Sequence, residues 1–119
     1  ACVLCCENEA DLSAIKNCLD ASIEAFNEGD NSNYANLNQS FHYEIWNGAA
    51  NEKLQKMLAE LWNGLSMGLK STESGYAKVS IEEHKKIYAA LEKRDAEAAR
   101  KAMHDHIYRS MADLLTRYQ

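Results

Sequence analysis

Apolar residues recur along this chain at intervals of three and four positions, which is the period of an α-helix. The clearest stripe places Leu12, Ile15, Leu19, Ile23 and Phe26 on one helical face. Alternating runs of β-branched residues, which would indicate strands, do not occur in the sequence, and proline is absent. The pattern therefore predicts an all-α fold in which amphipathic helices pack into one bundle.

Capping and stop signals divide the chain into a short helical tail and five full helices. We expect the tail over residues 1–7 and a first full helix from a capping box at 8–11 to near Gly29. The next two helices are expected from Asp30 to about 47–48 and from Asn51 to about Leu69, followed by a loop over 70–78. The last two are expected from a second capping box at 80–83 to about Lys93 and from Asp95 to the C-terminus.

The composition is that of an ordinary globular domain. The 119 residues are 46% hydrophobic and 26% charged, with a formal net charge of −5. Lysine and arginine do not cluster, which argues against direct binding to nucleic acid. An apolar run of about 20 residues, as a membrane span requires, is also missing from the sequence.

Four cysteines bear on the cellular compartment. Cys2, Cys5 and Cys6 are clustered, and Cys18 stands apart. The Cys2-x-x-Cys5 spacing would supply half of a zinc site, but a second pair at matching spacing is missing from the sequence. We interpret all four as thiols, buried or half-buried near a helix end, in a protein of the reducing cytoplasm.

Three of the four histidines are predicted to face the interior. On a helical wheel His42, His84 and His106 fall on the apolar sides of three different helices, whereas His104 falls on a charged side. One inward histidine is usually a neutral imidazole with a hydrogen-bond partner. Three together also fit a shared divalent metal, and Asn38, one turn before His42, offers a fourth oxygen ligand. Both interpretations are open on spacing alone.

The order of short motifs along the chain resembles that of a known family. The resemblance covers residues 9 to about 111 and is to the FCD domain, the effector-binding half of FadR-type GntR transcription regulators. It rests on Asn38-x-x-Phe41-His42, Ala49-Ala50-Asn51-x-x-Leu54, Glu83-His84-x-x-Ile87, Arg94-Asp95-Ala96-x-Ala98-Ala99 and Met103-x-x-His106-Ile107.

The resemblance implies an antiparallel bundle of about six helices around a central cavity that holds a divalent metal, with Zn or Ni favoured. The family's ligand positions fall here on Asn38, His42, His84 and His106. A small carboxylate effector is expected beside the metal, and the protein is expected to form a homodimer. Plausible cavity walls are Trp62, Tyr88, Met103 and Ser110, although each would also suit plain core packing.

The chain departs from the family pattern in two respects. Asn38 stands where the family has an aspartate, which removes a negative charge from the expected metal site. We expect the winged helix-turn-helix that precedes the family's domain to be missing, and the first helix to be reduced to the tail ending near Glu7. We therefore expect residues 1–119 to form a single effector-binding domain that does not bind DNA alone.

Two other classes of function compete with a ligand sensor. A three-histidine site with open positions is also what a zinc hydrolase uses to activate water. Glu83 is a carboxylate next to a ligand position, and its place in a capping box gives it another use. The second rival is a helical dimerisation module that binds no ligand.

Overall fold

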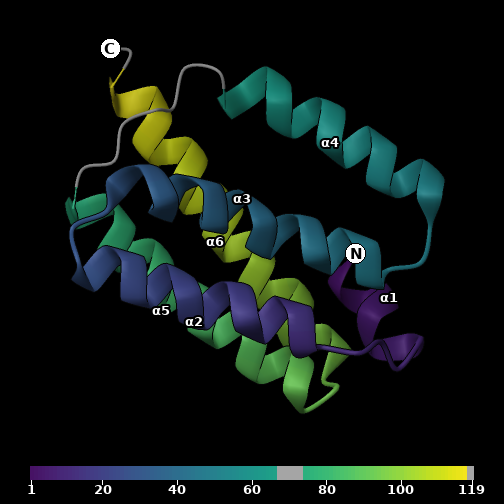
Figure 1. Cartoon of the computed structure of the whole chain (residues 1–119). Helices are drawn as coiled ribbons and strands as arrows, with labels where there is room; N and C mark the ends of the chain where they lie inside the picture. The colour runs from purple at the N-terminus through teal and green to yellow at the C-terminus, as the bar shows by residue number, and fades with distance from the viewer. Residues whose placement is uncertain (67–73, 118–119) are drawn as a thin grey trace.

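Six α-helices and short turns make up the part of the chain that the structure, a computed structural model, describes: residues 1–66 and 74–117 (Figure 1). No strand occurs within these ranges, and the predicted all-α fold is confirmed. The helices are α1 (Cys2–Glu7), α2 (Ser13–Asn27), α3 (Asn31–Gly48), α4 (Glu52–Ser66), α5 (Ser74–Glu92) and α6 (Ala96–Arg117).

The helices from α2 to α6 run in alternating directions along the bundle (Figure 1). Helix α2 packs against α3 and α5, and α6 packs against α5 and the short α1. Helix α4 packs on the side of α3 that faces away from α2 (Figure 1). The molecule measures 38 × 28 × 22 Å along its principal axes.

The apolar stripes meet in one main core and one smaller cluster. The main core gathers side chains from α1, α2, α3, α5 and α6 around Phe41 and Ile45, which are fully buried. The smaller cluster forms around Tyr34 and Ile81. On α4, by contrast, the apolar side chains of Met57 and Leu61 remain 53% and 61% exposed.

Three predicted helix caps are confirmed by side-chain hydrogen bonds. The carboxylate of Asp30 accepts from the Asn33 amide at 3.1 Å at the start of α3. The Asn51 amide oxygen accepts from the Leu54 amide at 3.0 Å, and Asp95 caps α6 by accepting from the Ala98 amide at 3.1 Å. Each bond pairs a first-turn amide that has no partner within its own helix.

The capping box predicted at residues 8–11 is wrong. Helix α2 begins only at Ser13, with Leu12 at the N-cap position. Asp11 instead accepts hydrogen bonds from the Ser13 amide at 2.9 Å and from the Ser13 hydroxyl at 2.7 Å. The Asp11 carboxylate is therefore already hydrogen-bonded in a local turn before the helix starts. Aspartate side chains often form such turns in place of helix caps.

The capping box predicted at residues 80–83 is also wrong. Helix α5 begins at Ser74, so residues 74–78 of the predicted loop are helical, and Ser80 lies buried inside the helix. Ser80 and Glu83 bind Arg109 of α6 instead of capping their own helix. The rest of that loop and the expected end of α4 at Leu69 lie outside the described residues.

Arg94 joins the start of the chain to the turn between α5 and α6. Its guanidinium donates hydrogen bonds to the carbonyl oxygens of Cys5 at 3.2 Å and Ala10 at 2.6 Å. The Arg94 backbone has φ of +56°, a left-handed conformation that ends α5 at the cost of some strain. These two bonds fix both sides of the C-terminus of α1 against the rest of the bundle.

Helix α1 also approaches the end of α3 closely. The Cys5 thiol donates to the Ile45 carbonyl at 3.1 Å, and a Cβ placed on Gly48 would lie only 2.9 Å from the Cys5 sulfur. All four cysteines are free thiols: Cys2, Cys5 and Cys6 are buried and Cys18 is half-buried, as expected. Burial raises the pKa of Cys2 to about 12, so this thiol stays protonated.

Candidate metal and effector site

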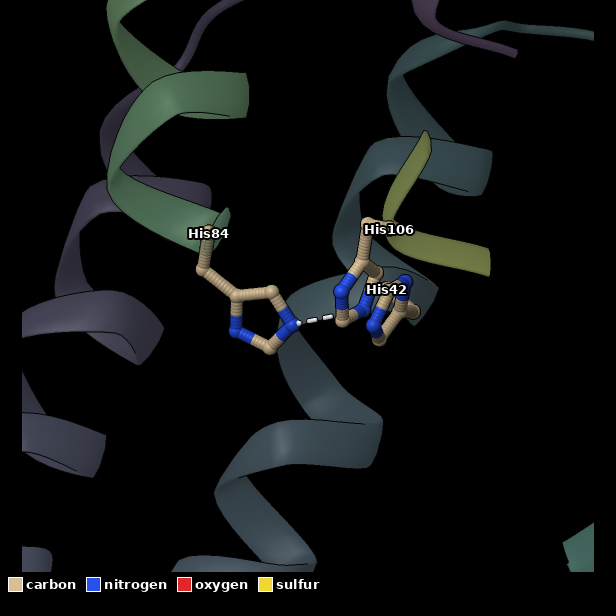
Figure 2. Close-up of side chains that lie close together, drawn as sticks. All are labelled: His42, His84 and His106. Carbon is tan, nitrogen blue, oxygen red and sulfur yellow. Dashed lines mark hydrogen bonds between the residues drawn. The ribbon is translucent and has the colours of Figure 1, made fainter. Parts of the chain in front are cut away.

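Three helices each direct one histidine into the same buried volume. His42 comes from α3, His84 from α5 and His106 from α6, and Figure 2 shows the three rings converging. One ring nitrogen of each lies within 4.8 Å of the other two. The predicted inward direction of these side chains is confirmed, as is the exposed position of His104, whose side chain is 68% accessible.

The rings contact one another directly. His84 Nε2 and His106 Nε2 are 3.1 Å apart. The ring of His42 stacks on that of His106, with centroids 5.3 Å apart and planes 10° from parallel. Phe41 stacks on the other imidazole, His84, at a centroid distance of 4.3 Å, which restricts that ring to its present plane.

Burial keeps all three imidazoles in their neutral form. Removal from water lowers the pKa of His42 to about 3, and proximity to His106 adds to this effect. Burial is also the main cause that lowers the pKa of His84, followed by the neighbouring His42 and His106. The pKa of His106 is lowered by burial as well, although Glu83 opposes the shift. Neutral imidazoles are the form that binds metal ions.

A charged hydrogen-bond network of Glu83 and Arg109 lies on the Nδ1 side of His106. His106 Nδ1 donates to Glu83 Oε1 at 2.8 Å, and the Glu83 carboxylate accepts two further hydrogen bonds from Arg109 Nε at 2.7 and 2.8 Å. Arg109 also binds Asp113 and the Ser80 hydroxyl. Because a carboxylate only accepts, His106 carries its proton on Nδ1 and presents the lone pair of Nε2 toward His84.

The same network removes Glu83 from consideration as a free base. Burial acts to raise the pKa of Glu83, but the hydrogen bonds from Arg109 and His106 outweigh burial, and the pKa lies below its ordinary value. Glu83 is thus an ionised carboxylate with fixed partners. A histidine held by a carboxylate on its remote nitrogen is the arrangement that orients metal-binding imidazoles.

Asn38 Oδ1, a buried atom on α3, finds no hydrogen-bond partner among the described residues, and it bears on whether a metal fits. His84 Nδ1 is also buried without a partner there, but the nitrogen of His84 that faces His106 is Nε2, and Nδ1 points away from the cluster (Figure 2). Asn38 precedes His42 by one turn of α3, so its side-chain oxygen is a further possible metal ligand on the same helix. Zinc binds imidazole nitrogens at about 2.0–2.1 Å, which places two such ligands roughly 3 to 4 Å apart. The residues present fit a divalent ion after a small closure of the cluster.

An apolar cavity of about 320 Å³ opens next to His42. It lies between α1, α3, α4 and α6, and two of the four predicted wall residues, Trp62 and Met103, line it. Tyr88 lies elsewhere, half-buried with Lys16 Nζ 5.9 Å from its ring centroid, and the Ser110 hydroxyl lies 3.5 Å from Arg109 Nη2.

The sequence did not identify the other walls or the supporting network. Ile45, Trp46, Leu58 and Ile107 line the cavity, but their apolar character is equally typical of plain core residues. Arg109 could have been noticed because it follows His106 by three positions and therefore shares its side of α6.

The described structure thus combines an antiparallel helical bundle with a buried three-histidine cluster beside an apolar cavity. The family model of the FCD domain matches residues 1–109, and the chain belongs to this family of C-terminal effector-binding domains of GntR-type regulators. No curated protein sequence matches the chain significantly. Among the described helices, none is both long and apolar enough to cross a membrane.

Proposed function

We propose that this chain senses a small carboxylate effector through a divalent metal site formed by His42, His84 and His106, with Asn38 as the fourth protein ligand. The observation that carries the proposal is the convergence of three neutral imidazoles from three helices, with ligand nitrogens within 4.8 Å of one another. Membership of the FCD family supports a sensing role, because these domains bind small effectors and typically dimerise.

The chemistry of the donors favours zinc or nickel. Imidazole nitrogen is a preferred ligand of both, whereas magnesium and calcium prefer an all-oxygen shell. When bound, the ion supplies positive charge and open coordination positions for a carboxylate. Asn38 contributes a neutral oxygen in place of an aspartate, so the net positive charge of the site is larger and the attraction for an anionic effector is stronger.

Effector binding acts by shifting an equilibrium between two packings of the bundle or of a homodimer. His42, His84 and His106 belong to α3, α5 and α6, so a ligand at the cluster contacts helices that are far apart in sequence. Any change in their relative positions is transmitted to the adjoining parts of a cytoplasmic regulator, whose DNA-binding domain reads the operator.

The test is elemental analysis of the purified protein together with three variants. The wild type is expected to carry one equivalent of divalent metal, and His42→Ala is expected to lose it. The matched control is His104→Ala, which removes an exposed histidine of α6 and should retain full metal content.

Asn38→Asp extends the same test to the fourth ligand. A carboxylate in place of the amide is expected to tighten metal binding by roughly tenfold, because charge count at a site sets its affinity. Equal metal content in the wild type and in His42→Ala would refute the proposed site. Unchanged affinity in Asn38→Asp would remove residue 38 from it.

A further inference from the structure

The cavity beside His42 has mostly apolar walls. His42 is one of the residues that line it, and the centroid of its ring lies 4.9 Å from that of Trp62. Most of the other walls are hydrocarbon and aromatic, and they include Leu58, Met103 and Ile107. A ligand that fills this space therefore meets the imidazole of His42 at one place and mostly apolar surface elsewhere.

The charged side chains around the cavity bear on where an anionic group of a ligand would lie. Among the described wall residues, charged side chains are limited to Arg100, which is mostly exposed and donates two hydrogen bonds to Glu97, at 2.5 and 3.2 Å. The proposed metal site, which includes His42, is consequently the place for the anionic group of a ligand. The mostly apolar walls offer few partners for additional hydroxyl groups, and a hydroxyl that loses its hydrogen bonds on binding weakens the affinity.

We propose that the effector is a monocarboxylate with an apolar aliphatic or aromatic body, bound with its carboxylate at the histidine cluster and its body in the cavity between α3, α4 and α6. This inference rests on the proposed metal-dependent sensing function and narrows its ligand. Small hydroxylated acids, which also carry a carboxylate, are disfavoured by the walls. The volume of about 320 Å³ accommodates a medium-sized body of this kind.

The experiment is isothermal titration of metal-loaded protein, after its metal content has been measured, with butyrate, hexanoate and octanoate below their micelle concentrations. The affinity is expected to rise by about fourfold for each added methylene, since each buries further apolar surface. The hydroxylated comparison is gluconate against hexanoate, which has the same number of carbon atoms. Gluconate is expected to bind at least roughly tenfold more weakly.

Two methionines provide a matched pair of variants. Met103→Gln places an amide in the cavity wall at nearly constant volume and should weaken octanoate binding by about tenfold. Met57→Gln makes the same change at a position of α4 that is 53% exposed, and should leave octanoate binding unchanged. Metal content is measured in both variants, so a loss of affinity is separated from a loss of the metal.

The outcomes distinguish this inference from the function on which it rests. A protein without metal refutes both. A metal-loaded protein that binds gluconate as tightly as hexanoate, or that binds no member of the aliphatic series, keeps the metal site but overturns the apolar effector. Octanoate binding that is equally tight after chelation would place the carboxylate away from the histidines and would also overturn the inference.

Discussion

Glu83 shows how one residue can be assigned to the wrong partner when only neighbours in sequence are considered. Its position three residues after Ser80 matches a capping box, but in the structure its carboxylate binds His106 and Arg109. The local pattern is a true feature of the sequence, and the tertiary contacts override it. The supporting role of Glu83 depends on two residues of α6, His106 and Arg109, that lie more than twenty positions further along the chain.

Glu83→Gln is expected to weaken metal binding by about 10- to 100-fold, because the neutral amide no longer holds His106 as a charged acceptor does. The measurement is a competition titration against a chromophoric chelator. Glu82→Gln is the matched control, since Glu82 is an exposed neighbour whose carboxylate pairs with Lys85 at 3.0 Å. Indistinguishable affinities for the two variants would show that Glu83 does not position the ligand.

The histidines illustrate what the sequence could predict at this scale. The helical period fixes the direction of each side chain relative to its own apolar stripe, so the inward positions of His42, His84 and His106 followed from spacing. Their mutual contact did not, because it depends on how three helices are rotated against one another. The order of the family's motifs supplied that information instead.

At the scale of the elements, caps predicted from single side chains succeeded where the side chain has no competing partner. Asp30, Asn51 and Asp95 are exposed and bind the first turns of their helices. The boxes at 8–11 and 80–83 failed because Asp11 satisfies itself in a turn and Ser80 is buried against Arg109. Boundaries are therefore predictable at exposed turns and unreliable where a polar residue faces another helix.

The contact between α1 and α3 limits substitution at Gly48. Gly48→Ala should destabilise the protein by about 1–3 kcal/mol, because the added methyl group meets the fully buried Cys5 sulfur at 2.9 Å. Urea denaturation measures this loss. In a Cys5→Ala background the same substitution should cost much less, and equal costs in the two backgrounds would contradict the steric explanation.

At the scale of the whole molecule, the three neutral imidazoles make stability depend on pH. The pKa of His42 falls from 6.5 to about 3 on folding, so the unfolded chain binds its proton first. The stability that the protein has with His42 neutral is fully present above about pH 6.5, and it is lost progressively as the pH falls toward 3. For the chelated, metal-free protein, His42 alone should reduce the free energy of unfolding by about 2 kcal/mol between pH 7 and pH 5.

Denaturant unfolding at both pH values measures this change. The comparison is His42→Gln, whose loss of stability between pH 7 and pH 5 should be smaller by about the same 2 kcal/mol. The same pH dependence in wild type and His42→Gln would show that His42 is protonated without cost in the native state.

The Arg94 guanidinium has a consequence for how the cavity opens. A helix of six residues is not stable in isolation, so α1 persists only through its docking to the bundle. Arg94 supplies part of that docking, and Ala1, Cys2 and Val3 at the other end of α1 form one side of the cavity. Loosening of α1 would therefore remove one wall of the cavity, and because Cys2, Cys5 and Cys6 of α1 belong to the main core, the same movement would uncover part of that core. The width of the cavity is thus coupled to the stability of the core through this one short helix.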